Sequence, residues 1–444
     1  MPVDYVYRID QPHVSGQLAK ICGVIAEGRG LIGDVDTITM GRERSIREIN
    51  VEVVDHEQAK TMAGLIAQIE DVRLITYFDR ALNRHTGGKL RIEGTMRMES
   101  FQDMRDVYTP GVARVCSAIA DDPSLASRLT MIGRTVAICT NGTRVLGLGD
   151  IGPVASMPVM EGKALFYRQM AGISAMPILI DTKDPDEFVE TVIRVAPGFG
   201  AIHLEDIRAP DCFEIERRLI EELDVPVMHD DVHGTAVACL AAVEVGCDRV
   251  ELALSDATVG QLGLGAAGFG IASLVVKAGA KRVIASDPNE EAHEQARSAG
   301  IELASFEDVM AEADIVVATT GRPGLIKPEM IREGQVIFAL TNPEPEIHAR
   351  DAEKAGAAFA GDGAAVNNVL GFPGIFRGAL EVGAKEISTG MKLAAARAIA
   401  DETEASELVP DALDTKVHDR VAEAVAQAAQ DEGLARPERT PPLL

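Results

Sequence analysis

The sequence predicts an α/β protein with parallel sheets, preceded by a small module of a different kind. Strand-like and helix-like apolar patterns alternate from about residue 93 onward, which is the order that builds parallel sheets. A glycine-rich GxGxxG segment follows one of these strands and opens a helical run, as in dinucleotide-binding folds. The chain has 444 residues, of which 46% are hydrophobic and 25% charged, so it can bury several cores.

The first 80 residues follow an order of their own. Strand-like segments at 3–9, 34–40, 45–54 and 72–78 surround helical segments at 14–27 and 57–69. This βαββαβ order is a split βαβ unit, and it resembles an ACT domain. The resemblance implies a regulatory module that holds a small effector near the turn at Asp10–Gly16. A module used only for contacts between subunits is the alternative.

Four further regions follow this ACT-like domain at 1–80. We expect a polar linker at 81–94, an α/β domain at 95–232, a Rossmann domain at 233–400 and a helical tail at 401–444 with one amphipathic helix at 415–430. Strands are predicted at 136–139, 175–180, 201–204, 227–229, 258–262, 282–285, 315–318 and 336–339. Helical patterns separate most of these strands, which favours parallel sheets.

Composition excludes several classes of function. Asp and Glu number 69 against 43 Lys and Arg, which gives a net charge of −26. This charge repels phosphate backbones and anionic lipids, so we expect neither nucleic-acid nor membrane binding. The six cysteines are scattered without a CxxC pair, which argues against disulfides and zinc. The N-terminus lacks the pattern of a signal peptide and no long apolar run follows, so a cytoplasmic protein is expected.

The GxGxxG segment predicts a dinucleotide site. Its members are Gly263, Gly265, Ala266, Ala267 and Gly268. Such glycines let the backbone approach a pyrophosphate at a helix N-terminus. Asp287 ends the next strand, 24 residues after Gly263, where an acid binds the ribose hydroxyls and repels a 2′-phosphate. This favours NAD, while Lys281 and Arg282 before the strand keep NADP as an alternative.

Two acidic pairs predict a metal site. Glu205 and Asp206 follow one predicted strand, and Asp230 and Asp231 follow the next. Carboxylates gathered without thiols suit a hard divalent cation such as Mg²⁺ or Mn²⁺. A solvated loop is the alternative for either pair alone.

Three other side chains are candidates for catalysis or substrate binding. Lys163 lies at the start of an apolar helix, and burial beside a carboxylate would make it suitable as a base. A surface lysine is the alternative. Arg144 lies in TRVLGLGD and could clamp a carboxylate or cap a strand. Tyr108 lies in VYTPG, where a packing role is the alternative to that of an acid.

Eight ordered motifs between about residues 95 and 400 closely resemble bacterial malic enzymes. These motifs are VYTPGVA, TRVLGLGDIGP, MEGKALFY, HLEDIRAPDCFEIE, HDDVHGTA, GLGAAG, TNPEPE and NNVLGFPGIFRGAL. Members of this family oxidise L-malate with NAD or NADP and decarboxylate the product to pyruvate and CO₂, using Mg²⁺ or Mn²⁺. The resemblance therefore implies the malic-enzyme N-terminal domain at 95–232 and the NAD(P)-binding domain after it.

The resemblance also implies a role for each carboxylate and for the lysine. Glu205, Asp206 and Asp231 match the metal ligands of the family. Lys163 matches the general base that takes the hydroxyl proton of malate, and Asp230 pairs with this lysine.

The remaining assignments concern the substrate and the cofactor. Tyr108 matches the general acid that protonates enolpyruvate, and Arg144 matches the carboxylate clamp. Asn342 and Asn368 match amides that orient the substrate, and Asn342 also borders the cofactor. The family resemblance implies a homodimer or homotetramer, and the separation of Tyr108 from the other residues leaves open whether one subunit completes a site.

Two alternatives to a malic enzyme come from other classes. One is a metabolite-sensing protein with a decayed catalytic domain, which intact Lys163, Tyr108 and metal ligands oppose. The other is an amino-acid dehydrogenase, whose metal-free chemistry would not need the two acidic pairs. An NADP-dependent enzyme or an oxaloacetate decarboxylase remains an alternative within the same class.

Overall fold

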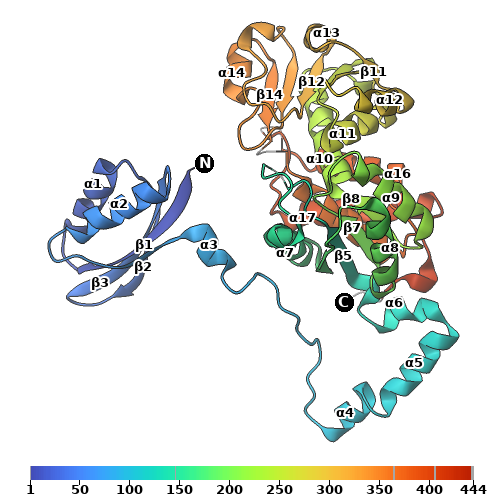
Figure 1. Cartoon of the computed structure of the whole chain (residues 1–444), viewed down its shortest axis with the longest axis horizontal. Coiled ribbons are helices and arrows are strands. Elements are labelled where there is room, and N and C mark those ends of the chain that lie inside the picture. The colour runs from blue at the N-terminus through green and yellow to red at the C-terminus, as the bar shows by residue number, and fades with distance from the viewer. Residues whose placement is uncertain (1, 146, 364–365, 405–406, 442–444) are drawn as a thin grey trace. The chain divides into compact units, whose positions relative to one another are not determined.

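The computed structural model describes residues 2–145, 147–363, 366–404 and 407–441, and the chain divides into two compact units (Figure 1). The first unit spans Met1–Lys89 and the second spans Leu90–Leu444. Each unit has a hydrophobic core built from its own residues. Each unit is therefore a separate folded body.

The first unit is a four-stranded antiparallel sheet with helices over one face. Its elements are β1 Val3–Pro12, α1 Gln17–Glu27, β2 Leu31–Met40, β3 Arg44–Val53, α2 His56–Ala67 and β4 Arg73–Asp79, with strand order β2-β3-β1-β4. Alternate residues Tyr5, Tyr7 and Ile9 of β1 pack beneath the helices, because side chains of a strand alternate between its faces. The expected βαββαβ order is present.

A short helix occupies the start of the segment expected as a polar linker. Helix α3 spans Arg80–His85, and the Asp79 side chain accepts a hydrogen bond from the Leu82 N–H at its first turn. This cap explains why a polar stretch forms a helical turn here. Farther along, Leu90 packs against the core of the second unit.

The second unit begins its core with a four-stranded parallel sheet. The strands are β5 Thr135–Thr140, β6 Ser174–Leu179, β7 Ala201–Leu204 and β8 Val227–His229, in the order β6-β5-β7-β8. The helices are α7 Pro153–Ala171, α8 Pro185–Val195, α9 Asp211–Glu222 and α10 Asp230–Arg249. Because the strands are parallel, the segments that follow β7 and β8 meet at one edge of the sheet.

A six-stranded parallel sheet follows. Its strands are β9 Thr258–Leu262, β10 Arg282–Ser286, β11 Glu302–Leu303, β12 Ile315–Ala318, β13 Val336–Ala339 and β14 Phe359–Asp362, in the order β11-β10-β9-β12-β13-β14. Its helices are α11 Ala266–Lys277, α12 Glu291–Ser298, α13 Phe306–Glu312 and α14 Ala349–Lys354. This is the dinucleotide-binding order, with its switch point between β9 and β12. The expected Rossmann fold is confirmed, and β11 and β14 are additional strands.

Helix α10 and the C-terminal helices join the two sheets into one body. Helix α10 runs without a break across the domain boundary expected between residues 232 and 233, and most of it is buried. Helices α15 Phe372–Glu381, α16 Thr389–Asp401 and α17 Thr415–Asp431 pack together, and α15 and α17 also contact α7. The C-terminal segment is therefore part of the core rather than a peripheral tail.

One segment of the second unit packs differently. Helices α4 Phe101–Val107, α5 Gly111–Asp121 and α6 Ala126–Leu129 precede β5, and none of their described side chains is buried. In Figure 1, α4 and α5 extend away from α7 and the β5–β8 sheet. The segment therefore leaves apolar side chains such as Phe101 and Met104 exposed.

Two exclusions drawn from the sequence can be compared with the structure. All six cysteines are free thiols in the part of the chain that the structure describes. Within the same residues, no helix combines the length and the apolar character needed to cross a bilayer.

Candidate active site

A cleft of about 990 Å³ lies in the second unit. Segments that follow strands of both sheets line it, because parallel strands present their carboxyl ends at one edge. Its wall contains these residues predicted from the sequence: Arg144, Asp231, Gly265, Ala266, Ala267, Gly268, Asp287, Asn342 and Asn368.

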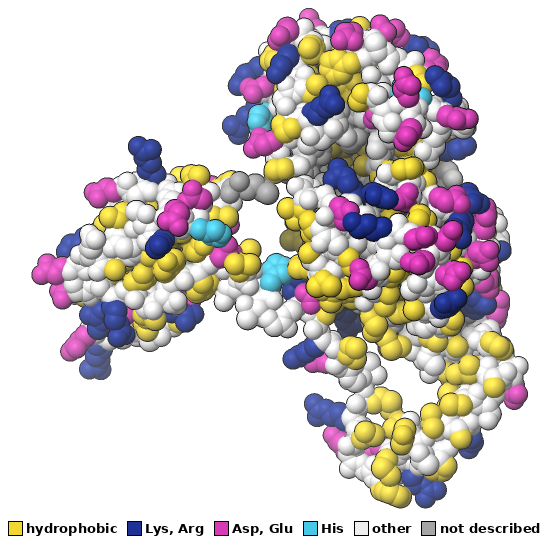
Figure 2. All heavy atoms as spheres, viewed as in Figure 1, with side chains coloured by type: hydrophobic (Ala, Val, Ile, Leu, Met, Phe, Trp, Pro, Cys, Tyr) yellow, Lys and Arg dark blue, Asp and Glu magenta, His cyan; other side chains and the backbone are white. Residues whose placement is uncertain are grey.

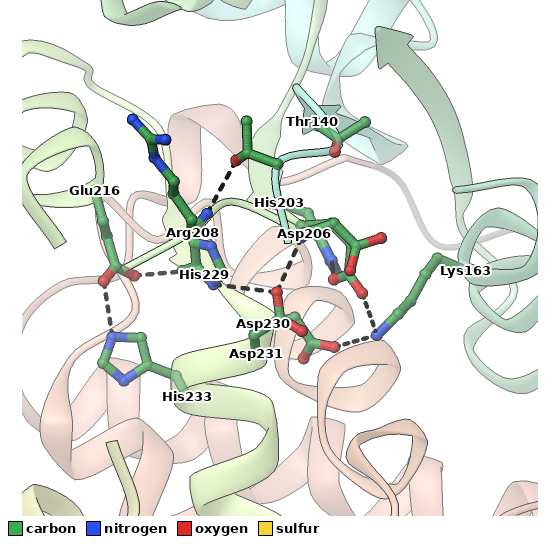
Figure 3. A network of polar contacts seen from close by, with 12 residues as sticks. Thr140, Lys163, His203, Asp206, Arg208, Glu216, His229, Asp230, Asp231 and His233 are labelled. Carbon is green, nitrogen blue, oxygen red and sulfur yellow. Dashed lines mark hydrogen bonds and ion pairs between the residues drawn. The ribbon is translucent and has the colours of Figure 1, made fainter. Parts of the chain in front are cut away.

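The three predicted metal ligands form a cluster. Glu205 and Asp206 follow β7, and Asp231 lies in the first turn of α10. One carboxylate oxygen of each lies within 4.8 Å of those of the others. The Asp206 backbone N–H donates to Asp231 Oδ2 at 2.9 Å (Figure 3). The cluster therefore depends on residues from two neighbouring strand ends.

The charge state of this cluster favours a cation. Burial raises the pKa of Glu205 to about 8 and the pKa of Asp206 to about 9, and the charge of Asp231 adds to both effects. Asp206 Oδ2 is buried without a hydrogen-bond partner among the described residues. Oxygen ligands with this much mutual repulsion fit a hard divalent cation, which would neutralise them.

Lys163 lies beside the cluster on α7. Its ammonium contacts the Asp230 carboxylate and lies 3.1 Å from Glu205 Oε1 (Figure 3). Burial alone would lower the pKa of Lys163, but the charges of Asp230 and Glu205 outweigh it and raise the pKa above its ordinary value. A Cβ at Gly234 would lie 1.7 Å from Asp230 Oδ1, so only glycine permits this packing. The lysine is thus a buried, paired group.

Arg144 and Tyr108 differ in their relation to the cleft. Arg144 lies in the cleft wall, and its backbone N–H donates to the Asp206 carbonyl at 3.0 Å. Tyr108 ends α4, is 69% exposed and is not among the described residues that line the cleft. Lys163, Glu205, Asp206 and Asp230 are not among these lining residues either, but they form one group with Asp231, which does line the cleft. Tyr108 belongs to neither the cleft wall nor this group among the described contacts.

The glycine segment lies at the switch point of the Rossmann sheet. A Cβ at Gly268 would lie 2.0 Å from the Gly263 carbonyl oxygen, whereas a Cβ at Gly265 would meet open space. The turn and the start of α11 can therefore approach a ligand closely. Asp287 Oδ2 accepts from the Leu264 N–H at 2.6 Å, so the predicted ribose-binding acid also holds the glycine turn.

The two predicted amides come from different loops. Asn342 follows β13, and its Nδ2 donates to the Gly363 carbonyl at 3.3 Å. Asn368 begins a short 3-10 helix before α15. Both line the cleft together with Asp231 and Gly268, which places amide groups between the carboxylate cluster and the glycine turn.

Sequence reasoning missed three buried residues behind the site. Tyr167 bonds to His203, and His203 in turn bonds to Glu205. Glu216 on α9 accepts from the His229 N–H at 2.7 Å and pairs with His233 at 3.0 Å, which holds the start of α10. Their spacing in the sequence could have indicated them. His203 and Glu205 are two residues apart at a strand end, and Lys163 and Tyr167 are four residues apart on a helix, so the members of each pair lie on the same face.

Models of two protein families match the second unit. The N-terminal domain of malic enzymes matches residues 89–220. The NAD-binding domain of D-isomer specific 2-hydroxyacid dehydrogenases matches residues 243–323. The first match covers β5 to β7 and ends before β8, and the second covers β9 to β12 of the Rossmann sheet.

Relatives match almost the whole chain. NAD-dependent malic enzyme 1 of Bacillus subtilis (strain 168) is 49% identical over 423 residues, which is 95% of this chain and 96% of that protein. An NAD-dependent malic enzyme of Geobacillus stearothermophilus is 41% identical over 95% of this chain and 94% of that protein.

Solved structures match the second unit in fold and sequence. A malic enzyme from Pyrococcus horikoshii is 39% identical with a TM-score of 0.74, covering 79% of this chain and 88% of that one. An NAD-dependent malic enzyme from Thermotoga maritima is 37% identical with a TM-score of 0.74, covering 79% of this chain and 99% of that one. Fold, motifs and full-length similarity agree, and the chain belongs to the malic enzyme family.

Proposed function

We propose that this protein oxidises L-malate with NAD and releases pyruvate and CO₂, using a divalent cation. The observation that carries the proposal is the contact of buried Lys163 with Asp230 and Glu205, directly beside the Glu205–Asp206–Asp231 cluster. An amino-acid dehydrogenase would have no use for this cluster. A decayed sensor would not need to maintain a buried lysine among carboxylates, which is costly to fold.

Lys163 is the proposed base. It acts as the neutral amine, which forms when the ammonium passes a proton to the Asp230 carboxylate that it contacts. The amine then takes the proton of the C2 hydroxyl of malate while a hydride leaves C2 for NAD. Asp230 holds the lysine in place through their direct contact. A cation at Glu205, Asp206 and Asp231 would supply Lewis-acid stabilisation of the negative charge that develops on substrate oxygens. Loss of CO₂ then leaves an enolate that needs a proton at C3.

Arg144, Asn342 and Asn368 are the proposed substrate-orienting groups. All three line the cleft. A guanidinium at its wall would attract a dicarboxylate into a chain of net charge −26. The two amides donate hydrogen bonds without adding charge, so they orient the substrate near Lys163 without competing for its proton.

NAD is the proposed cofactor rather than NADP. Asp287 lies in the cleft wall at the end of β10, next to the glycine turn. A carboxylate there attracts ribose hydroxyls and repels a 2′-phosphate. The malic enzymes of Bacillus subtilis and Geobacillus stearothermophilus that match over most of the chain are both NAD-dependent, which supports the same choice.

Tyr108 is the proposed general acid, supplied by a second copy of the chain in a homodimer or homotetramer. Tyr108 is 69% exposed, and the neighbouring Phe101 is 71% exposed. Figure 2 shows apolar side chains along the segment of α4 and α5. Exposed apolar surface of this kind is typical of an interface, and Tyr108 is not among the described residues that line the cleft of its own chain.

The N-terminal unit is proposed to bind a small carboxylate effector. Helix α1 begins at Gly16 without a side-chain cap and without an acid in its first turn. Gln11 and Gln17 flank this turn, are 2% and 5% exposed, and keep Oε1 and Nε2 unpartnered among the described residues. The unpartnered donor Gln17 Nε2 at a helix N-terminus suits a carboxylate, and the unpartnered acceptor Gln11 Oε1 suits the ammonium of an amino acid.

Malate oxidation tests the proposed reaction. Purified protein given L-malate, Mn²⁺ and NAD should form NADH, and EDTA should abolish the signal because the carboxylate cluster loses its cation. The Mn²⁺ concentration that gives half-maximal rate should decrease as the pH is raised from 6 to 9. The carboxyls of Glu205 and Asp206, with pKa values of about 8 and 9, must lose their protons to bind the metal. No product with either NAD or NADP would refute the proposal.

Replacement of the base separates catalysis from cofactor binding. Lys163→Ala should lower kcat for malate oxidation by roughly 100-fold or more, because proton transfer is lost. The affinity for NADH, measured by its fluorescence, should not change. Lys354→Ala removes an exposed lysine paired with Asp351 on α14 and serves as the matched control. If NADH affinity falls in parallel with kcat, Lys163 is structural.

Mixing two inactive variants tests the shared site. Lys163→Ala and Tyr108→Phe should each be inactive alone. When they are unfolded and refolded together, half of the dimers are mixed and each has one intact site, so about a quarter of the parental activity should return. A site contained within one chain predicts no recovery in the mixture, and that result would exclude the shared arrangement.

Removal of the first unit tests its regulatory role. Residues 90–444 contain a complete core, so they should still oxidise malate. With each common L-amino acid as probe, at least one should shift the melting temperature of the full chain, and Gln17→Leu should abolish that shift. Absence of any shift with the full chain, or an identical shift with residues 90–444, would contradict an effector site here.

A further inference from the structure

A chain of buried hydrogen bonds leads away from the predicted metal ligand Glu205. The Tyr167 hydroxyl lies 2.8 Å from His203 Nδ1, and His203 Nε2 lies 2.7 Å from Glu205 Oε2. Tyr167 and His203 are 0% exposed and Glu205 is 3% exposed. Among the described side-chain hydrogen bonds, Tyr167 bonds to His203 and His203 bonds to Glu205, so we assign this pair a role toward Glu205 rather than toward the substrate.

Two sets of side chains near Glu205 are close enough to hold a cation. One is the Glu205–Asp206–Asp231 cluster, and the other consists of His203, Glu205 and Asp230. In the second set, both ring nitrogens of His203 already have partners, and the Lys163 ammonium contacts both carboxylates. The lysine therefore occupies the cation position of the second set. His203 is left to act on Glu205 as a hydrogen-bond partner.

The geometry assigns the protons of this chain. Glu205 binds a metal ion as a carboxylate, which only accepts hydrogen bonds, so in that form His203 Nε2 carries the proton that it shares with Glu205. In the neutral ring, Nδ1 then accepts from the Tyr167 hydroxyl. The tyrosine thereby fixes the histidine tautomer that donates to Glu205, the usual arrangement around metal-binding side chains.

Aromatic packing holds the histidine ring in this orientation. The ring stacks on Phe376 with centroids 5.5 Å apart, and it meets Phe372 edge-on at 5.5 Å. Phe372 also lies 4.5 Å from the Lys163 ammonium. Both phenylalanines belong to α15, so the C-terminal helices support the predicted ligand and the predicted base from behind.

We propose that His203, oriented by Tyr167, is a positioning residue that directs one oxygen of Glu205 away from the metal site so that the other faces Lys163 and the cation. The inference rests on the metal site of the proposed function. Without the histidine N–H, the Glu205 carboxylate would lose its only anchor besides Lys163 among the described contacts. Its two oxygens would then no longer be distinguished, and the ligand set would bind more weakly.

Mn²⁺ affinity in the absence of substrates tests this proposal. The dissociation constant is measured by the electron paramagnetic resonance signal of free Mn²⁺ in the full-length protein. His203→Leu should weaken Mn²⁺ binding roughly 10-fold to 100-fold, the range seen when such supporting partners are removed. His203→Gln keeps an N–H donor and should retain most of the affinity. Tyr167→Phe removes only the hydroxyl and should give a smaller loss than His203→Leu.

A second buried histidine is the matched control. His418 on α17 is 0% exposed and bonds through Nε2 to the Ala412 carbonyl. His418→Gln should lower the melting temperature without changing Mn²⁺ affinity. If His203→Leu does not fold, Tyr167→Phe and His203→Gln still carry the comparison.

Three outcomes separate the possible explanations. If His203→Leu folds and binds Mn²⁺ with the parental affinity, the positioning role is overturned. If His203→Leu does not fold, parental Mn²⁺ affinity in Tyr167→Phe overturns the role instead. An equal loss in His203→Gln and His203→Leu would overturn it as well, because the donor would then be irrelevant. If the unmodified protein itself fails to bind Mn²⁺, the proposed function fails, and the positioning role falls with it.

Discussion

The site depends on the compensation of buried negative charge by one ammonium group. Glu205 and Asp230 are almost completely buried, and isolated carboxylates in such places would be very costly to ionise. The Lys163 ammonium contacts both of them. This requirement constrains the fold, because α7, the end of β7 and the start of α10 must converge at a single point.

The joining of the two sheets follows from the same constraint. Helix α10 begins at Asp230 directly after β8 and then packs against α11 of the Rossmann sheet. From the other side, Phe372 of α15 covers the Lys163 ammonium, and α17 packs against α7. The cleft is lined by the glycine turn of the Rossmann sheet and by Arg144 and Asp231 from segments that follow the other sheet, so the proposed cofactor and substrate can meet there.

Strands and glycine turns were predictable where local patterns carry the information. Short Val- and Ile-rich runs marked the eight predicted strands of the second unit, and the expected Rossmann fold and malic enzyme family are both confirmed. The two-residue strand β11 and the Gly-containing β14 lacked such runs. The boundary expected at 232–233 cut through α10, since a domain limit depends on contacts between distant segments. The amphipathic pattern of α17 predicted its helix but not its packing partners.

The sequence by itself determined the order of elements, the chemical types at the strand ends and the family, because these follow from neighbouring residues and ordered motifs. It placed Lys163 and Asp230 on separate segments 67 residues apart, with no local signal that they touch. Only the tertiary structure brought His203 and Tyr167 behind Glu205 and left Tyr108 exposed. Parallel strands bring distant residues to a common edge, and which side chains then meet depends on packing across the sheets rather than on proximity in the chain.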